Sequence, residues 1–192
     1  WSSPSTENLI NVEPRQMTTV QKERLLERKN VFTLYHQTDE VGVAEIETSH
    51  MLFPTLCEMY NSNIYFSESP KDTTEAHKTP RRYGIMLECQ VNVGNYEIDV
   101  GYYRRCRYWK EWQDENVDSL VSSQRWGREW VVFFPEQIEY AKYYKCNYDG
   151  RRTGPIKDMN LFNLSSSISN NTWRYCVYCS KHCVGYCRKH KG

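Results

Sequence analysis

Apolar and polar residues alternate in short segments of this chain, and the period of each segment predicts an element. Between Tyr83 and Gly94 the alternation has a period of two, which predicts a long strand with one buried face. We expect that face to consist of Ile85, Leu87, Cys89, Val91 and Val93. Shorter segments rich in β-branched and aromatic residues predict further strands over 31–36, 63–67, 129–134 and 138–144.

Residues that cap helices predict the helical segments. Threonines at positions 18 and 19 can cap a helix that ends near Arg28, and an aspartate at 39 can cap a second helix over 40–48. A proline at position 70 predicts a third helical segment over 71–77. The inward-facing residues are expected to be Val20, Leu25 and Leu26 in the first helix and Val43, Ala44 and Ile46 in the second.

Several short strands with few long helices predict an α+β domain. The 192 residues give room for one such domain and an appendage. We expect a flexible N-terminal arm over 1–13, the domain over 14–146 and a loop-rich, cysteine-rich C-terminal extension over 147–192. The longest apolar run, 131–134, is far too short to cross a bilayer, so no membrane span is expected.

Charge and aromatic content leave one question open. The formal net charge is +1, which disfavours non-specific coating of nucleic acid. Within 102–128, however, aromatic and basic side chains alternate, and such a stretch can either stack bases or pack as an ordinary surface. Its members are Tyr102, Tyr103, Arg104, Arg105, Arg107, Tyr108, Trp109, Lys110, Trp112, Arg125, Trp126 and Arg128.

The cysteine content favours an oxidising compartment. The chain has eight cysteines, an even number that is typical of disulfide-bonded secreted proteins. It begins at Trp1, and two glycosylation sequons start at Asn163 and Asn170, so we expect a secreted or extracellular protein that has lost a signal peptide, with a cytoplasmic or nuclear location as the alternative. The cysteines are Cys57, Cys89, Cys106, Cys146, Cys176, Cys179, Cys183 and Cys187.

The C-terminal tail is also dense in residues that bind zinc. Four cysteines and two histidines, His182 and His190, lie within 176–190. Their spacing lacks the long loop that separates the ligand pairs of ordinary zinc fingers, so zinc is possible but not favoured. The favoured interpretation is a disulfide-braced tail, some of whose cysteines pair with Cys57, Cys89, Cys106 or Cys146.

Three separated segments place one chemically capable residue within or beside a short apolar strand. These residues are His36, Tyr65 and Glu129. Taken singly, each is more often structural or solvated than catalytic. The motifs around them recur in a fixed order along the chain, as 35–38 (Tyr-His-Gln-Thr), 63–69 (Asn-Ile-Tyr-Phe-Ser-Glu-Ser), 86–94, 118–120 (Asp-Ser-Leu) and 129–138.

In this order the motifs resemble the His-Tyr-Glu signature of ADP-ribosyltransferases, in the branch similar to poly(ADP-ribose) polymerases. The resemblance covers roughly 31–145. It implies an α+β fold with a split pair of antiparallel sheets around a cleft that binds NAD, whose nicotinamide–ribose bond is cleaved through an oxocarbenium-like transition state. It also implies transfer of ADP-ribose to a macromolecular acceptor.

The resemblance assigns roles residue by residue. His36 would contact a ribose hydroxyl as donor, and the backbone of Gln37, followed by Thr38, would bind the nicotinamide amide. Tyr65 would stack on the pyridine ring. Thr73 would offer a hydroxyl to the amide. Glu129 would bind the 2′-hydroxyl of the reacting ribose, polarise the acceptor and stabilise the developing positive charge. The resemblance thus makes His36, Tyr65 and Glu129 the catalytic residues.

The sequence departs from the family pattern in ways that bear on the pocket. Gln37 and Asn63 replace glycines, and Ala76 stands where many polymerases have a second tyrosine. Since the acceptor loop also differs, we expect mono-ADP-ribosylation by a toxin-like secreted enzyme, with a protein acceptor favoured over nucleic acid. NAD hydrolysis and a non-catalytic, disulfide-rich binding module on the same fold remain the alternatives.

Overall fold

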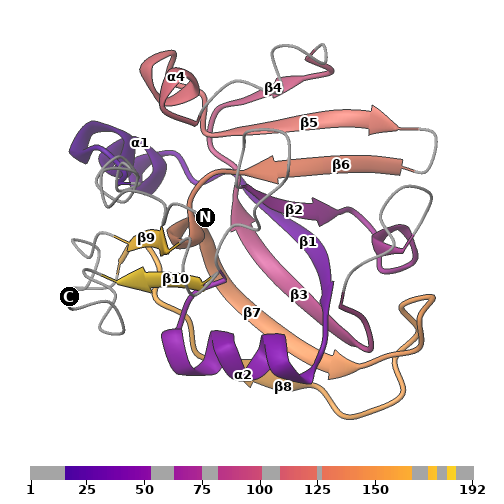
Figure 1. The fold of residues 1–192 in the computed structure, drawn as a ribbon. Coiled ribbons are helices and arrows are strands. Elements are labelled where there is room, and N and C mark those ends of the chain that lie inside the picture. The colour runs from indigo at the N-terminus through magenta and orange to yellow at the C-terminus, as the bar shows by residue number, and fades with distance from the viewer. Residues whose placement is uncertain are drawn as a thin grey trace, which may run out of the picture.

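Eight strands form one sheet, in the order β4-β5-β6-β2-β1-β3-β7-β8 (Figure 1). The computed structural model describes residues 16–52, 63–74, 82–100, 109–124, 127–165, 173–176 and 181–184. Neighbouring strands run antiparallel except β4 and β5, which are parallel. The strands are β1 (Val31–Thr38), β2 (Ile64–Ser67), β3 (Ile85–Asn92), β4 (Tyr96–Ile98), β5 (Ser119–Gln124), β6 (Gly127–Val132), β7 (Ile138–Lys145) and β8 (Lys157–Met159).

Few helices accompany this sheet in the described part of the chain, so the predicted α+β class is confirmed. They are α1 (Thr19–Glu27), α2 (Glu40–Ser49), α4 (Trp109–Asp114) and the 3₁₀ turns η2 (Lys71–Thr73) and η3 (Pro135–Gln137). A separate two-stranded sheet pairs β9 (Trp173–Cys176) with β10 (Lys181–Val184). Within the described residues, no helix is long and apolar enough to cross a membrane.

The sheet narrows sharply between β1 and β2. Those two strands share a single pair, Tyr35 opposite Ser67. By contrast, β1 pairs with β3 along its whole length, from Val31 opposite Asn92 to Thr38 opposite Ile85. The sheet therefore consists of two halves, β4-β5-β6-β2 and β1-β3-β7-β8, that stay connected through one short junction.

The largest core cluster takes residues from both halves of the sheet and from α2. Leu34 and Cys89 come from one half, Phe66 and Trp130 from the other, and all four are at most 1% exposed. The predicted apolar face of β3 is confirmed, because each of its five residues is buried in this cluster. Burial of this apolar surface from both halves is what holds them together.

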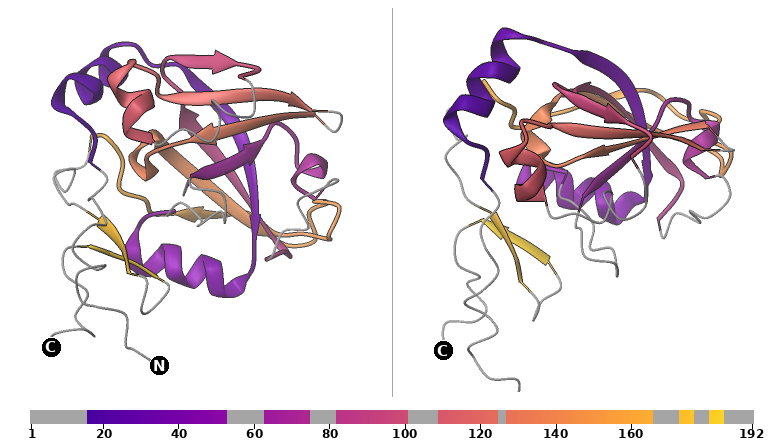
Figure 2. Two further views of the ribbon diagram at one scale, coloured as in Figure 1. Left: turned by 45° about the horizontal axis from the view of Figure 1, so that its top comes forward. Right: turned by 90° about the horizontal axis from the view of Figure 1, so that it is seen from above.

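A second core cluster lies where α4 meets β6. Trp109 and Trp112 of α4 pack with Val131, Phe133 and Phe134. Ordinary packing is therefore the correct interpretation for these two tryptophans of the aromatic and basic stretch. Helices α1 and α4 lie side by side at this end of the sheet (Figure 2), and Gln113 Nε2 donates to Gln21 Oε1 at 2.7 Å between them. The members of that stretch at 102–108, 125 and 126 lie outside the described residues.

Both predicted helix caps are confirmed, but the inward faces predicted for α1 and α2 were partly wrong. The hydroxyl of Thr18 accepts from Gln21 N at 3.1 Å, and the carboxylate of Asp39 accepts from Gly42 N at 2.8 Å. The wrong assignments are Val20, which is 68% exposed, Leu26, which is 36% exposed, and Ala44, which is also exposed. Helix α1 instead buries Gln21 together with Leu25, because it docks on a buried carboxylate, Asp118, that needs polar partners.

Part of the predicted C-terminal extension packs on the main sheet. Strand β8 pairs with β7, with Ala141 opposite Met159, and Met159 belongs to the largest core cluster. Only the first turn of the helix expected over 71–77 is described, as η2, and 75–81 lie outside the described residues. The predicted arm at 1–13 and the cysteines at 57, 106, 179 and 187 also lie outside them.

Candidate functional site

His36 and Tyr65 come together at the narrow junction between the two halves of the sheet. His36 lies near the end of β1, and its Nδ1 is 2.8 Å from the main-chain carbonyl oxygen of Tyr65 on β2. The imidazole also meets the ring of Phe66 edge-on, with 5.9 Å between centroids. Because a carbonyl can only accept, Nδ1 carries the proton of this bond, and in the neutral ring Nε2 is then the acceptor nitrogen.

This bond changes the direction of the contact expected of His36. The resemblance made the imidazole a donor to a ribose hydroxyl. A neutral His36 that donates from Nδ1 would instead accept that hydroxyl proton at Nε2, and only the imidazolium would donate from both nitrogens. The contact of this ring with a ribose stays a prediction.

Glu129 lies on β6, directly beside β2. It stands opposite Ser67 in the β2–β6 ladder and opposite Ser122 in the β5–β6 ladder. Directly opposed residues of antiparallel strands share a face, and so do residues two apart on one strand. Tyr65 and Glu129 are therefore diagonal neighbours on the same face of this half-sheet. The three residues singled out by sequence thus lie on three consecutive strands of the sheet, β1, β2 and β6. By the same rule, however, it is Tyr35 that shares the face of Tyr65 and Glu129, because Tyr35 stands opposite Ser67. The ring of His36 meets Phe66 on the other face.

The strand that carries Glu129 is anchored by its neighbours on the other face. Trp130 is 1% exposed, and its indole Nε1 donates to Glu68 Oε1 at 2.9 Å. Arg128 Nη1 lies 3.6 Å from the same carboxylate oxygen. Since Glu68 follows β2 directly, these contacts fix the start of β6 against the end of β2. They limit the freedom of the backbone on either side of Glu129.

Gln37, Thr38 and Thr73, the other predicted site residues, are all buried. Gln37 and Thr73 are hydrogen-bonded to each other, with 2.9 Å between Gln37 Nε2 and Thr73 Oγ1. The Thr73 hydroxyl donates to Pro70 O at 2.7 Å, so its proton is already used and only its oxygen remains to accept. The structure therefore brings Gln37 and Thr73 together, through a side chain that the sequence reasoning had treated only as a departure from glycine.

The partners of Gln37 beyond Thr73 could not have been found from the sequence. Gln37 Oε1 accepts from Gly84 N at 3.1 Å, and Nε2 also donates to Tyr148 O at 3.4 Å. Both partners use main-chain atoms and lie 47 and 111 positions away along the chain. No local pattern of residue types signals such contacts.

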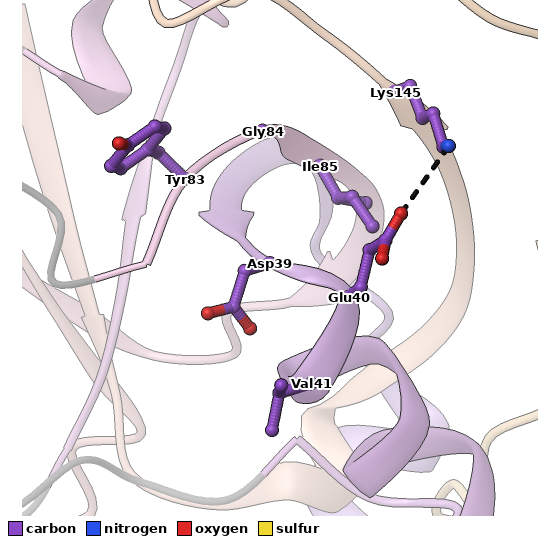
Figure 3. A pocket seen from close by; sticks show the side chains of 7 residues that line it. All are labelled: Asp39, Glu40, Val41, Tyr83, Gly84, Ile85 and Lys145. Atoms are coloured by element: carbon purple, nitrogen blue, oxygen red, sulfur yellow. Dashed lines mark ion pairs between the residues drawn. The ribbon is translucent and has the colours of Figure 1, made fainter.

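A shallow pocket of about 360 Å³ is lined in part by Gly84 (Figure 3). Seven residues line it, among them Asp39, Tyr83 and Lys145, and none of them is His36, Tyr65 or Glu129. Glu40 and Lys145 form an ion pair across it at 3.4 Å. Tyr83 is 59% exposed. This pocket is thus next to Gln37, but separate from the three residues that the sequence singled out.

A small buried cluster on the β1-β3-β7 half contains two tyrosines whose pKa is raised. Tyr144 packs with Met86, Cys146 and Tyr35, and burial, followed by the negative charge of Glu88, raises the pKa of Tyr144 to about 12. Burial and Glu88 also raise the pKa of Tyr35. These phenols therefore stay protonated well above neutral pH.

Cys89 and Cys146 are both free thiols, which corrects part of the disulfide prediction. Cys89 is 1% exposed in the largest core cluster, and Cys146 is 8% exposed beside Tyr144. Burial raises the pKa of both thiols, so each behaves as a small apolar side chain. Neither of these two cysteines braces the tail. The pairing of the other cysteines is not described.

No cluster of three or more histidine, cysteine, aspartate or glutamate side chains that could hold a metal ion occurs among the described residues. Three of the six zinc ligands considered in the tail, Cys179, Cys187 and His190, lie outside the described residues. The chain matches no protein-family model, and a search of curated proteins finds no significant match. The function must therefore be argued from the residues themselves.

Proposed function

We propose that this protein is an NAD-dependent ADP-ribosyltransferase that transfers a single ADP-ribose unit to a macromolecular acceptor. The observation that carries the proposal is the placement of His36, Tyr65 and Glu129 on three consecutive strands, although the sequence separates them by tens of residues. The narrow junction at Tyr35 and Ser67 also supports the split sheet that the family resemblance implies.

The reaction breaks the bond between the nicotinamide nitrogen and C1′ of the ribose. The bonding electrons leave with the pyridine ring as neutral nicotinamide, and C1′ takes on oxocarbenium character. The acceptor then forms a new bond to C1′ with a lone pair and releases its proton. A carboxylate near C1′ lowers the barrier because it attracts charge that exists only in the transition state. Glu129 is assigned this role.

Tyr65 and His36 are assigned to binding. A phenol ring on the same face as Glu129 offers an apolar surface on which a pyridine ring can stack. The imidazole of His36, held by the Tyr65 carbonyl, offers Nε2 to a ribose hydroxyl. Contacts to the pyridine ring and to the ribose would hold NAD in one orientation relative to Glu129 and to the acceptor.

The acceptor and the setting belong to the same proposal. A protein side chain is favoured over nucleic acid, since two tryptophans of the aromatic and basic stretch are buried and unavailable for stacking. We favour a secreted, toxin-like enzyme. The cysteine content is one argument for secretion, but Cys89 and Cys146 are free thiols and do not add to it.

The test is incubation of the purified protein with radiolabelled NAD and a mixture of proteins, followed by assay of free nicotinamide and of labelled protein. Glu129→Gln should lower nicotinamide release by about 10²–10³-fold, the usual cost of removing one electrostatic stabiliser. Glu139→Gln is the matched control. Glu139 is also a strand carboxylate, on β7, and it lies 3.7 Å from the ammonium of the exposed Lys29. The control should keep wild-type activity.

Each outcome has a clear meaning. Labelled protein in the wild type and its loss in Glu129→Gln support the transferase. Release of free ADP-ribose with no labelled protein would instead identify an NAD glycohydrolase. If the wild-type protein leaves NAD intact with every acceptor, or if Glu129→Gln is as active as Glu139→Gln, the proposal is wrong.

A further inference from the structure

Both the NH₂ group and the carbonyl oxygen of the Gln37 side chain are hydrogen-bonded, to three segments that are far apart in the chain. Its Nε2 donates to Thr73 Oγ1 at 2.9 Å and to Tyr148 O at 3.4 Å, and its Oε1 accepts from Gly84 N at 3.1 Å. The residue is 6% exposed. The end of β1, η2, the start of β3 and the turn after β7 therefore meet around one amide group.

The partners of this amide are held in place by contacts of their own. The Thr73 hydroxyl donates to Pro70 O at 2.7 Å, which leaves its oxygen facing Gln37 as an acceptor. The turn that contains Tyr148 packs closely against the same proline at Gly150, where an added Cβ would lie 2.6 Å from Pro70 O. The donor and the acceptors are thus arranged by backbone packing and not by Gln37 alone.

The set of partners is selective in its chemistry. Two acceptors face the NH₂ group and one N–H donor faces the carbonyl oxygen, which is what a primary carboxamide needs. A carboxylate of the same shape has no proton to give to Thr73 or Tyr148, and its charge would be buried without a cation. A site that hydrogen-bonds a group in this way rejects analogues that lack it.

We propose that this arrangement is a binding site for primary carboxamides, which Gln37 fills with its own side chain. An external carboxamide can enter only when that side chain leaves. If the proposed function holds, the nicotinamide amide of NAD is the natural occupant, and the need to displace Gln37 lowers the apparent affinity for NAD by the fraction of molecules in which the site is open. This last step rests on the proposed function, whereas the carboxamide site itself does not.

The test is to empty the site and refill it. Gln37→Ala removes a CH₂–CONH₂ group, and acetamide supplies the same atoms. The variant should be less stable than the wild type, and acetamide should restore stability. At about ten times its Kd, the folded-to-unfolded ratio of Gln37→Ala should rise about elevenfold. Acetate at the same concentration and ionic strength should have no such effect, and neither compound should stabilise the wild type.

A second readout locates the effect. The amide proton of Gly84 should shift upfield in Gln37→Ala because it loses its acceptor, and saturating acetamide should return it toward its wild-type position. If the variant does not fold alone, acetamide in the refolding buffer should rescue folding and acetate should not. Rescue by neither compound, or by both equally, would overturn the proposal.

Gln90→Ala is the matched control. Gln90 lies on the neighbouring strand β3 and also pairs with a threonine, with 2.9 Å between its Nε2 and Thr33 Oγ1, but this pair is on the exposed face of the sheet. Its removal leaves no enclosed amide site, so acetamide should not stabilise Gln90→Ala. Stabilisation of both variants to the same degree would show a solvent effect and would count against the site.

NAD assays separate this inference from the proposed function. If acetamide stabilises Gln37→Ala and the variant also binds nicotinamide more tightly than the wild type, the site and its natural occupant are both supported. If acetamide stabilises the variant but neither protein binds nicotinamide or cleaves NAD, the carboxamide site stands and the proposed function fails. If acetamide has no effect, the site fails whatever the activity toward NAD.

Discussion

The imidazole of His36 is bonded to the main-chain carbonyl of Tyr65, with 2.8 Å between Nδ1 and the oxygen. Side-chain-to-backbone bonds of this kind survive changes in the partner side chain. His36 is therefore held by the β2 backbone itself. Its bond lies beside the single ladder pair, Tyr35 opposite Ser67, that joins β1 to β2. The two halves of the sheet are coupled here by one imidazole and one ladder pair.

We predict that neutral His36 is the Nδ1-protonated tautomer. Long-range ¹H–¹⁵N correlation spectra should show a proton on Nδ1 and an unprotonated Nε2 above the pKa of the ring. His36→Ala should weaken NAD binding as well as turnover, while Tyr65→Phe should leave the tautomer unchanged because the carbonyl is retained. A neutral His36 protonated at Nε2 would contradict the observed bond.

Asp118 is predicted to be the most important carboxylate for folding. It is fully buried, and it accepts from Arg24 Nη2, from Gln21 Nε2 at 2.8 Å and from Asn95 N at 2.8 Å. Asp118→Asn leaves the guanidinium of Arg24 without its counter-charge and places an NH₂ group among donors. We expect a loss of about 3 kcal/mol in the free energy of unfolding, near the lower end of the range for a broken buried pair, because Arg24 keeps 19% exposure.

Glu40→Gln is the control for that loss, measured in the same urea titrations. Glu40 pairs with Lys145 at 3.4 Å, but both side chains are more than two-thirds exposed. Such a pair contributes about 0–1 kcal/mol. Equal losses in the two variants would show that burial of Asp118 is not what matters.

Period-two strands and helix caps were predictable from the sequence, and buried polar positions were not. Strand β3 was found because its inward residues are all apolar. Strand β5 was missed because both of its faces are buried. Ser119 and Ser122 therefore stand beside Leu120 and Val121 without the alternation of polar and apolar residues that marks a strand with one buried face. Ser119 is tolerated there since its hydroxyl donates to Val93 O at 2.6 Å.

The candidate site shows the same division. The residues at 36, 65 and 129 could be named from their motifs, because each motif is local. The role of the Gln37 side chain depends on Gly84 and Tyr148, which only the tertiary fold brings to it. Contacts between main-chain atoms and a distant side chain leave no mark in residue type, so they must be read from the structure.

Replacing Gly42 with alanine is predicted to destabilise the fold, although glycine-to-alanine changes normally stabilise helices. Glycine costs about 1 kcal/mol relative to alanine in a helix interior. A Cβ at Gly42, however, would lie 2.0 Å from Thr38 Oγ1, so the hydroxyl must move. We expect Gly42→Ala to destabilise the fold by about 1–3 kcal/mol, as overpacking does. Thr38→Ala should relieve most of this loss in the double variant, and additive losses would show that the clash is not the cause.

The free state of Cys89 and Cys146 gives a direct prediction for alkylation. In the native protein without reductant, iodoacetamide should leave Cys89 unmodified because it is 1% exposed. After unfolding in guanidinium, still without reductant, both residues should be alkylated completely. Mass spectrometry of the peptides that contain them measures this, and a bridge from either cysteine to the tail would appear as a missing alkylated peptide.

Tyr144 should make the fold sensitive to alkaline pH. Its pKa is raised in the folded protein to about 12 from an ordinary 10.0, chiefly by burial. The folded state therefore favours the protonated phenol, and the stability linked to this group is fully present below pH 10 and is lost as the pH rises toward 12. Screening by solvent limits the loss to the order of 1 kcal/mol.

Tyr144→Phe should remove this part of the decline, whereas Tyr148→Phe, at a residue that is 46% exposed, should not. Urea midpoints measured at pH 8, 10 and 11 test the difference, and parallel declines in the wild type and Tyr144→Phe would assign the alkaline sensitivity to other groups, such as the buried thiol of Cys89.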